Sequence, residues 1–276
     1  MIVYSILEPS MKNVTNVTQL NLKTWRESAS LILAAKSIFC KSPNREHASD
    51  FNYKVLGLQR SLKSKFMANA YVFPGGNVSK TDSNPSWMKV FEKFGYDSKL
   101  FKELYPEENV PLIMQNDEIQ RLPKYLSLRI CAIRETFEEC GILICKSNNI
   151  ENNKNLTSSW ASYIEGNEII KWQQKIHDNT EEFLNLCTQL DLCPDVCALK
   201  NWSNWKTPSD EHFRFNAMFF FTNFSQMPSV NKEEKEIQNV KWYAPSEYLQ
   251  EHSERKLMLP IPQFYEISRL KKLFGY

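Results

Sequence analysis

The chain has 276 residues, of which 42% are hydrophobic and 13% aromatic, enough to fill the core of one large domain or two small ones. Its formal net charge of +2 gives no electrostatic basis for general nucleic-acid binding. No apolar run approaches the ~20 residues needed to span a bilayer. These features lead us to expect a globular, soluble, intracellular protein that does not act at a membrane.

The cysteines do not form a recognisable framework, because their number is odd and no two of them stand in a CxxC pair. We expect them to be small, buried, apolar residues in a reducing compartment. The seven are Cys40, Cys131, Cys140, Cys145, Cys187, Cys193 and Cys197.

The first half of the chain predicts three strands. Residues 1–22 are polar and are expected to form a flexible arm, with residues 23–276 as a single domain. Alternating or continuous apolar residues then predict the strands. They cover residues 28–35, 52–60 and 70–73; a hairpin-like loop over 41–50 separates the first two, and Pro74-Gly75-Gly76 ends the third.

A long helix is predicted from Pro123 to Cys140, followed by Gly141 at the position of a C-cap glycine. The segment before it, residues 77–122, has turn signals throughout and is expected to be a surface excursion with one short helix over residues 87–94.

The second half predicts a loop, two strands and four helices. The loop covers residues 146–163, and the strands cover 213–224 and 240–243. Two of the helices lie within 165–190 and are separated by a break near 178–180, and the other two cover 245–252 and 262–273. This order of elements predicts one α/β domain with inserted helices.

Glu135, Glu138 and Glu139 share one face of the predicted long helix. They repel one another and lie near the helix C-terminus, where the macrodipole disfavours negative charge. Such a cluster is suited to hard divalent cations, Mg²⁺ or Mn²⁺. The alternative is a solvated acidic face that is paired locally with Arg134 and Lys146.

Two motifs resemble the two halves of the Nudix box. Arg134-Glu135-x-x-Glu138-Glu139-x-Gly141-Ile142 resembles its second half, and Phe73-Pro74-Gly75-Gly76 resembles its entrance. The resemblance implies an α/β/α sandwich with a mixed β-sheet and hydrolysis of a diphosphate linked to another moiety. It also implies glutamates that hold divalent metal ions and an arginine that orients one of them.

The spacing of the box is unusual. Its glycine and arginine are usually fourteen positions apart, but Gly76 and Arg134 are 58 apart, so 44 additional residues split the motif. The box glutamate, counted eight positions back from Arg134, falls on Leu126. That glutamate is therefore absent or displaced into the insertion.

A long insertion inside the box is similar to that of the acyl-coenzyme A diphosphatase branch of the family. Further similarity covers about residues 25–270, including Leu58-Gln59-Arg60-Ser61, Asn201-Trp202-Ser203-x-Trp205 and Leu259-Pro260-x-Pro262-Gln263. The branch implies metal-dependent cleavage of coenzyme A and acyl-coenzyme A into 3′,5′-ADP and (acyl-)4′-phosphopantetheine.

The resemblance assigns roles to individual residues. Arg134, Glu135 and Glu139 are expected to be catalytic, with either glutamate as the general base, and Glu135, Glu138, Glu139 and Glu236 are expected to bind metal. The expected substrate-binding residues are Gly75, Gly76 and Arg60, the last at the 3′-phosphate of coenzyme A.

Four residues also have a plain structural interpretation. Arg60 is alternatively an exposed arginine at a strand end, and Glu236 one charge in a solvated run. Trp202 and Trp205 could border a substrate pocket or belong to the core.

Two rival functions stay open: a Nudix hydrolase of another nucleotide, such as ADP-ribose or capped RNA, and a catalytically silent Nudix-fold binding module. We expect a monomer that binds a small-molecule substrate. The resemblance favours the peroxisome, yet the chain ends Leu273-Phe274-Gly275-Tyr276, unlike a Ser-Lys-Leu signal. Mitochondrion and cytosol are the alternatives.

Overall fold

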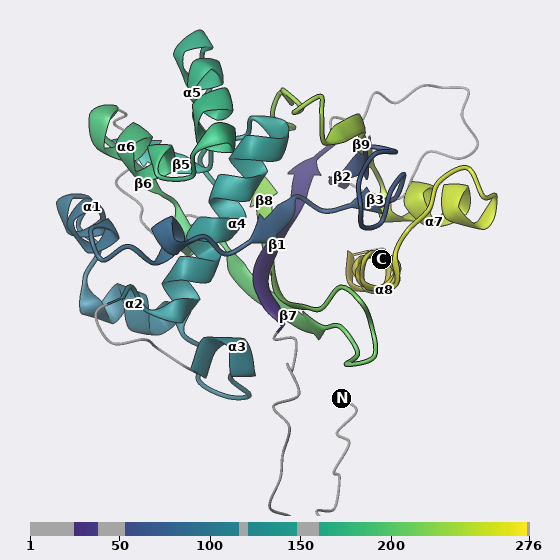
Figure 1. Ribbon diagram of the computed structural model, residues 1–276, viewed down its shortest axis with the longest axis horizontal. Coiled ribbons are helices and arrows are strands. Elements are labelled where there is room, and N and C mark those ends of the chain that lie inside the picture. Colours follow the sequence, from purple (N-terminus) through teal and green to yellow (C-terminus); the bar gives the residue numbers. More distant parts are fainter. Residues whose placement is uncertain (1–24, 38–52, 116–120, 148–159, 275–276) are drawn as a thin grey trace, which may run out of the picture.

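This computed structural model describes residues 25–37, 53–115, 121–147 and 160–274 (Figure 1). The expected arm over 1–22, the loop over 41–50, Cys40 and most of the loop over 146–163 lie outside the described residues.

A mixed seven-stranded sheet forms the centre of the molecule. Five strands follow the order β3 (Tyr71–Val72), β2 (Tyr53–Arg60), β1 (Arg26–Lys36), β8 (Phe215–Phe224) and β7 (Lys200–Lys206). In addition, β4 (Gly75–Asn77) pairs with β1, and β9 (Ile237–Tyr243) pairs with β2. Among the described strands of this sheet, β1 and β8 run parallel and the other pairs are antiparallel.

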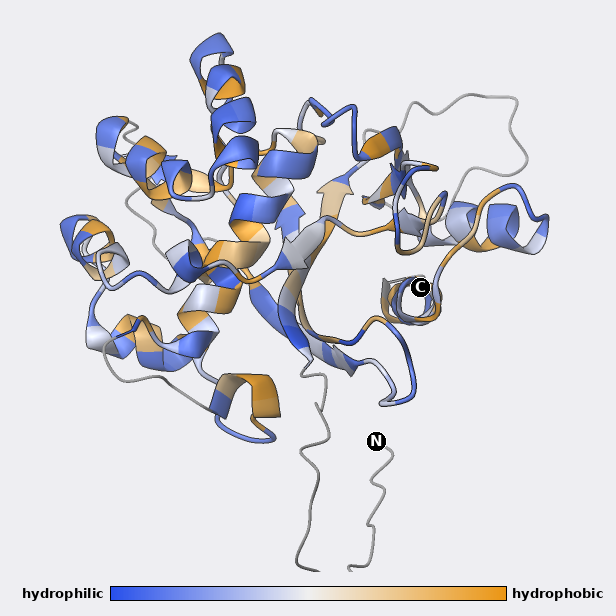
Figure 2. Ribbon diagram, in the orientation of Figure 1, coloured by the Kyte–Doolittle hydropathy of each residue, from blue (hydrophilic) through white to orange (hydrophobic). Residues whose placement is uncertain are grey.

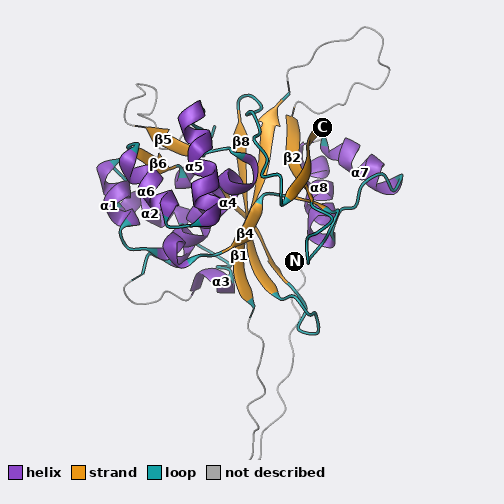
Figure 3. Ribbon diagram, turned by 45° about the horizontal axis from the view of Figure 1, so that its top comes forward, coloured by secondary structure: helices purple, strands orange, loops and turns teal. Residues whose placement is uncertain are grey.

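Helices cover both faces of the sheet (Figures 1 and 3). On one face lies α4 (Lys124–Cys140), and on the other lie α7 (Pro245–Ser253) and α8 (Ile261–Phe274). Alternate side chains of β1 pack on opposite faces of the sheet. Leu31 and Leu33 belong to the core under α4, and Ile32 belongs to the core under α7 and α8. This arrangement confirms the predicted α/β/α sandwich with a mixed sheet.

Apolar residues run along β1 and through the middle of α4, whereas α7 is mainly hydrophilic (Figure 2). None of the described helices combines the length and the apolar character that crossing a bilayer requires. The six cysteines in the described part of the chain are free and buried, as expected of small core residues.

The insertion is more structured than the sequence pattern predicted. It contains a 3₁₀ turn η1 (Lys80–Ser83) and three helices, α1 (Trp87–Lys93), α2 (Ser98–Leu104) and α3 (Leu112–Gln115), where we expected one helix. The expectation of a surface excursion is also wrong, because Trp87 and Phe91 are fully buried in the α4 core. Trp87 packs on Phe183, with 5.5 Å between the ring centroids.

The insertion begins and ends at the same place. The backbone N–H of Leu122 donates to the carbonyl of Ser83 at 3.0 Å, which joins the outgoing and returning chain. We call Lys80–Ser83 together with residues 121–122 the neck of the insertion. A closed neck explains how the motif tolerates 44 additional residues, since loop-closure entropy grows only slowly with length.

The rest of the chain follows the predicted order. Helices α5 (Asn167–Asp178) and α6 (Glu182–Gln189) are broken where expected. Strands β5 (Cys145–Ser147) and β6 (Leu192–Pro194) form a separate two-stranded sheet, and a 3₁₀ turn, η3, covers Val196–Ala198. The sequence pattern did not predict β4, β5, β6 or β7.

The buried insertion leads to a test of stability. Trp87→Ala should lower the free energy of unfolding by about 3–5 kcal/mol, because it opens a cavity and removes the indole N–H bond to Thr81. Trp160→Ala is the matched control, since Trp160 is 42% exposed. Urea unfolding measures both, and equal small losses would show that the insertion is peripheral to the core.

Candidate active site

The Gly75-Gly76 turn is fixed against the central sheet. In the β1–β4 pairing, Ser30 lies opposite Gly75 and Ala29 opposite Gly76. Gly75 has a φ of +156°, and a Cβ there would collide with the carbonyl oxygen of Ala29. The site therefore requires glycine at position 75, where the backbone turns from the sheet toward α4.

The C-terminal end of α4 is capped by Gly141, which has a φ of +71° and donates its N–H to Phe137 O at 2.9 Å. The last carbonyls are satisfied from another segment: Glu233 N donates to Glu139 O at 3.0 Å and Asn231 N to Cys140 O at 2.9 Å. These bonds hold the segment 231–236 beside the acidic end of α4.

Arg134 is the centre of the site. Its side chain is 1% exposed, and Nε and Nη2 donate to the two oxygens of Asp82 at 2.8 and 2.9 Å. Nη1 lies 2.6 Å from Glu138 Oε1 and 2.9 Å from Glu135 Oε1. One guanidinium thus holds three carboxylates from the insertion and from α4 in fixed positions.

The glycine turn lies directly against the acidic face of α4. The N–H of Gly75 donates to Glu139 Oε2 at 2.9 Å. A Cβ on Gly76 would lie 2.5 Å from Glu135 Cδ, so only glycine permits this approach. The two halves of the split motif therefore meet in space.

The carboxylates carry more negative charge than the protein neutralises. Asp82, Glu135, Glu138 and Glu139 contribute a formal charge of −4 against +1 from Arg134. Burial raises the pKa of Glu135 to about 7, and burial likewise raises the pKa values of Glu138 and Glu139. Repulsion between the carboxylates adds to this effect.

These contacts contradict a solvated acidic face. Glu138 is 8% exposed and Glu139 is 4% exposed. Lys146 does not pair with them, because its Nζ lies 3.3 Å from Asp195 Oδ1 in another part of the structure.

The donor set fits a hard divalent cation. It consists of oxygen ligands only, and each carboxylate has about four lone-pair sites, of which the observed bonds use few. Within the described residues, no three His, Cys, Asp or Glu side chains form a finished metal cage as they stand. Arg134 holds Glu135 and Glu138, and Gly75 holds Glu139.

Sequence reasoning missed Asp82. We counted the box glutamate back from Arg134 and reached Leu126, which is fully buried in the apolar core. Counted forward from Gly76, the same position is six residues on and falls on Asp82. The acidic residue is thus displaced into the insertion, and counting from both ends of the split motif would have found it.

Two other expected residues lie close to the carboxylates. Arg60, at the end of β2, donates its Nε to Phe66 O at 3.2 Å, and its charge lowers the pKa of Glu139. The charge of Glu236 raises the pKa values of Glu138 and Glu139. Both side chains are therefore near enough to act on the site electrostatically.

The two tryptophans take the structural role. Trp202 and Trp205 both donate their indole N–H to the fully buried carboxylate of Glu266 in α8, at 2.6 and 2.9 Å. They fix α8 to β7 in the core on the opposite face of the sheet from α4.

This combination of fold and site defines a class of protein. A mixed-sheet α/β/α sandwich in which a glycine turn meets a glutamate-rich helix is the arrangement of a Nudix hydrolase. The crystal structure of a NUDIX hydrolase from Alicyclobacillus acidocaldarius matches it with a TM-score of 0.61 at 17% identity, and covers 92% of each chain. That likeness shows the fold.

The sequence comparisons narrow the class to a family. The family model described as the NUDT19 Nudix domain matches residues 25–270. Acyl-coenzyme A diphosphatase NUDT19 of Xenopus laevis is 35% identical over 268 residues, covering 90% of this chain and 70% of that protein. The human protein of the same name is 31% identical over 258 residues, covering 89% and 68%. The chain belongs to the NUDT19 Nudix domain family and is a Nudix hydrolase.

The buried ion pair leads to a prediction about stability. Asp82→Asn should cost about 3–5 kcal/mol of unfolding free energy, because Arg134 would lose its bidentate partner while still buried. Asp191→Asn removes a half-buried partner of the exposed Lys93 at 2.7 Å and should cost at most about 1 kcal/mol. Chemical denaturation compares the two, and equal losses would mean that Asp82 does not anchor the site.

Proposed function

We propose that this chain hydrolyses the diphosphate of coenzyme A and acyl-coenzyme A, releasing 3′,5′-ADP and (acyl-)4′-phosphopantetheine. The observation that carries the proposal is the similarity to acyl-coenzyme A diphosphatases along about 90% of the chain. The assembled Arg134–carboxylate network supports it, because a silent binding module has no need of these residues.

Nudix hydrolases generally use divalent metal, and we propose Mg²⁺ or Mn²⁺ here. Glu135, Glu138 and Glu139 would hold it, with Glu236 contributing from the neighbouring segment. When bound, the metal neutralises diphosphate charge and lowers the pKa of water. Arg134 keeps Glu135 and Glu138 oriented, and the Gly75 N–H does the same for Glu139.

Glu135 and Glu139 are the two candidates for the general base, which takes the proton of the attacking water. Burial raises the pKa of Glu135 toward neutral, which is the direction that a general base needs. The bond from Gly75 stabilises the charged form of Glu139 and so opposes the effect of burial, which raises its pKa.

Arg60 and the two glycines form the proposed substrate-binding group. Because Arg60 acts on the charge of Glu139, its position favours contact with the diphosphate at the reaction centre. The 3′-phosphate, our first expectation for Arg60, is separated from the diphosphate by the ribose. Gly75 and Gly76 let the backbone approach the phosphates because neither has a side chain.

The domain organisation and the cellular location concern the whole chain. We infer a single domain over residues 23–276, with the insertion as an integral part, which limited proteolysis tests through the size of the protected fragment. A peroxisomal location is inferred from the family, and microscopy of the tagged full chain distinguishes it from mitochondrion and cytosol.

The metal assignment predicts a loss of both activity and metal-dependent stabilisation. Glu139→Gln keeps the shape and removes the charge, so turnover should fall by at least ~10²-fold. Mg²⁺ at about 100 times its Kd should stabilise the wild type by ~2.7 kcal/mol, a shift of several degrees in Tm.

The control for this experiment is Glu168→Gln, which neutralises an exposed glutamate on α5. It should keep both turnover and the Mg²⁺-dependent shift. If Mg²⁺ raises the Tm of the Glu139→Gln variant as much as that of the wild type, and the variant has normal turnover at saturating Mg²⁺, Glu139 is not a metal ligand.

The substrate assignment predicts a preference. The kcat/KM for coenzyme A should exceed that for ADP-ribose or capped RNA in one buffer with one metal, and mass spectrometry should identify 3′,5′-ADP as a product. An equal or higher kcat/KM for ADP-ribose would favour the rival nucleotide hydrolase.

A further inference from the structure

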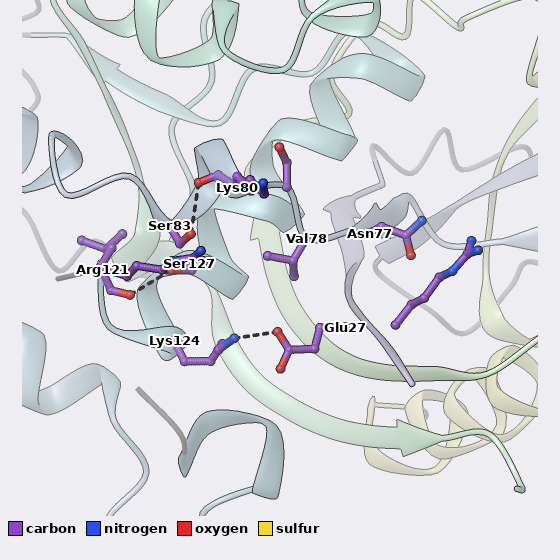
Figure 4. A pocket seen from close by; sticks show the side chains of 11 residues that line it. Glu27, Asn77, Val78, Lys80, Ser83, Arg121, Lys124 and Ser127 are labelled. Atoms are coloured by element: carbon purple, nitrogen blue, oxygen red, sulfur yellow. Dashed lines mark hydrogen bonds and ion pairs between the residues drawn. The ribbon is translucent and has the colours of Figure 1, made fainter. Parts of the chain in front are cut away.

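A cavity of about 430 Å³ lies beside the carboxylate site, between the start of β1, the neck of the insertion and the start of α4 (Figure 4). Its lining reaches the active site at Asn77, whose carbonyl accepts from Arg134 Nη2 at 3.1 Å. The carboxylates of Glu135, Glu138 and Glu139 do not line it. The cavity is thus a separate space that touches the site at one end.

The cavity is basic, in contrast to the nearly neutral chain. Arg26, Lys80, Arg121 and Lys124 line it, against one carboxylate, Glu27, which gives a formal charge of +3. The whole chain carries only +2. Lys124 is bonded to Glu27 at 2.6 Å, whereas within the described part of the chain neither Arg26 nor Lys80 forms an ion pair with a carboxylate.

The start of α4 adds to this positive potential. The helix begins at Lys124 without a side-chain cap and has no acidic residue in its first turn. A helix of 17 residues directs the positive end of its dipole toward this end. Figure 4 shows Lys124 and Arg121 on one side of the cavity, with Glu27 and Asn77 across from them.

The cavity and the carboxylates lie along one face of α4. Lys124, Ser127, Arg134 and Glu138 recur at helical spacing on that face. At ~1.5 Å per residue, Ser127 and Arg134 are on the order of 10 Å apart. The chain from Gly76 to Lys80 covers a similar span, so a ribose that carries a diphosphate at one end and a phosphate at the other can bridge the two places.

We propose that this cavity is the subsite for the phosphate monoester of the substrate, the 3′-phosphate of coenzyme A. This proposal rests on the proposed function, whose substrate carries that group in addition to the diphosphate. Lys80 and Arg121 come from the neck and are exposed, so both can reach an entering phosphate. The insertion therefore contributes to substrate selection.

The test compares coenzyme A with dephospho-coenzyme A. In the double variant Lys80→Gln/Arg121→Gln, KM for coenzyme A should rise at least ~10-fold, as expected for lost charge-assisted bonds to phosphate. KM for dephospho-coenzyme A should change less than ~2-fold. Lys99→Gln/Lys102→Gln is the matched control, since it removes two exposed charges from α2 of the same insertion and should leave both values unchanged.

Arg60→Gln distinguishes the two basic regions. If Arg60 contacts the diphosphate, this variant weakens both substrates alike, whereas the cavity variant weakens only coenzyme A. Equal effects of Lys80→Gln/Arg121→Gln on both substrates, or no effect on either, would overturn the subsite while leaving the proposed diphosphatase activity standing.

A binding measurement keeps the test independent of turnover. Calorimetry should show that the wild type binds 3′,5′-ADP more tightly than 5′-AMP, and that Lys80→Gln/Arg121→Gln abolishes the difference. A wild type that cleaves coenzyme A but binds both nucleotides equally lacks the subsite. If coenzyme A is not cleaved yet the preference for 3′,5′-ADP holds, the proposed function fails and the phosphate subsite stands.

Discussion

The buried guanidinium of Arg134 is the interaction on which the rest of the site depends. It is bonded in bidentate fashion to Asp82 from the insertion and also contacts Glu135 and Glu138 on its own helix. A buried ion pair gains little over an apolar pair, but losing one partner leaves an expensive unpaired charge. The arrangement therefore specifies position: Asp82 has to return to α4, and this fixes where the insertion leaves and re-enters the sandwich.

The sequence predicted the frame of this structure well, because the frame follows from hydrophobic periodicity. The strand at residues 28–35 and the helix from 123 to 140 were found within two residues of their observed bounds. Short elements were missed for a physical reason. Strand β4 consists of Gly75, Gly76 and Asn77, whose low strand propensity is overridden by pairing with β1.

The acidic face of α4 was predictable, but its surroundings were not. Glu135, Glu138 and Glu139 share a helix face in any helix of this sequence. That this face is buried, and that Gly76 approaches Glu135 too closely for a Cβ, follows only from the sheet. Asp82 depends on a contact 52 residues away along the chain, which no local pattern encodes. The position of this acidic residue follows from the spacing of the motif only when it is counted forward from Gly76 as well as back from Arg134.

The neck of the insertion contributes both to the buried ion pair with Arg134 and to the lining of the basic cavity. Asp82 lies between Lys80 and Ser83, and the carbonyl of Ser83 holds the returning Leu122. The side that faces α4 carries the negative charge of Asp82, which is bonded to Arg134, while Lys80 and Arg121 bring positive charge to the cavity. A substrate with a diphosphate and a separate phosphate meets both signs along one helix. In the proposed function, the carboxylate site would take the group to be cleaved and the positive cavity the group to be retained.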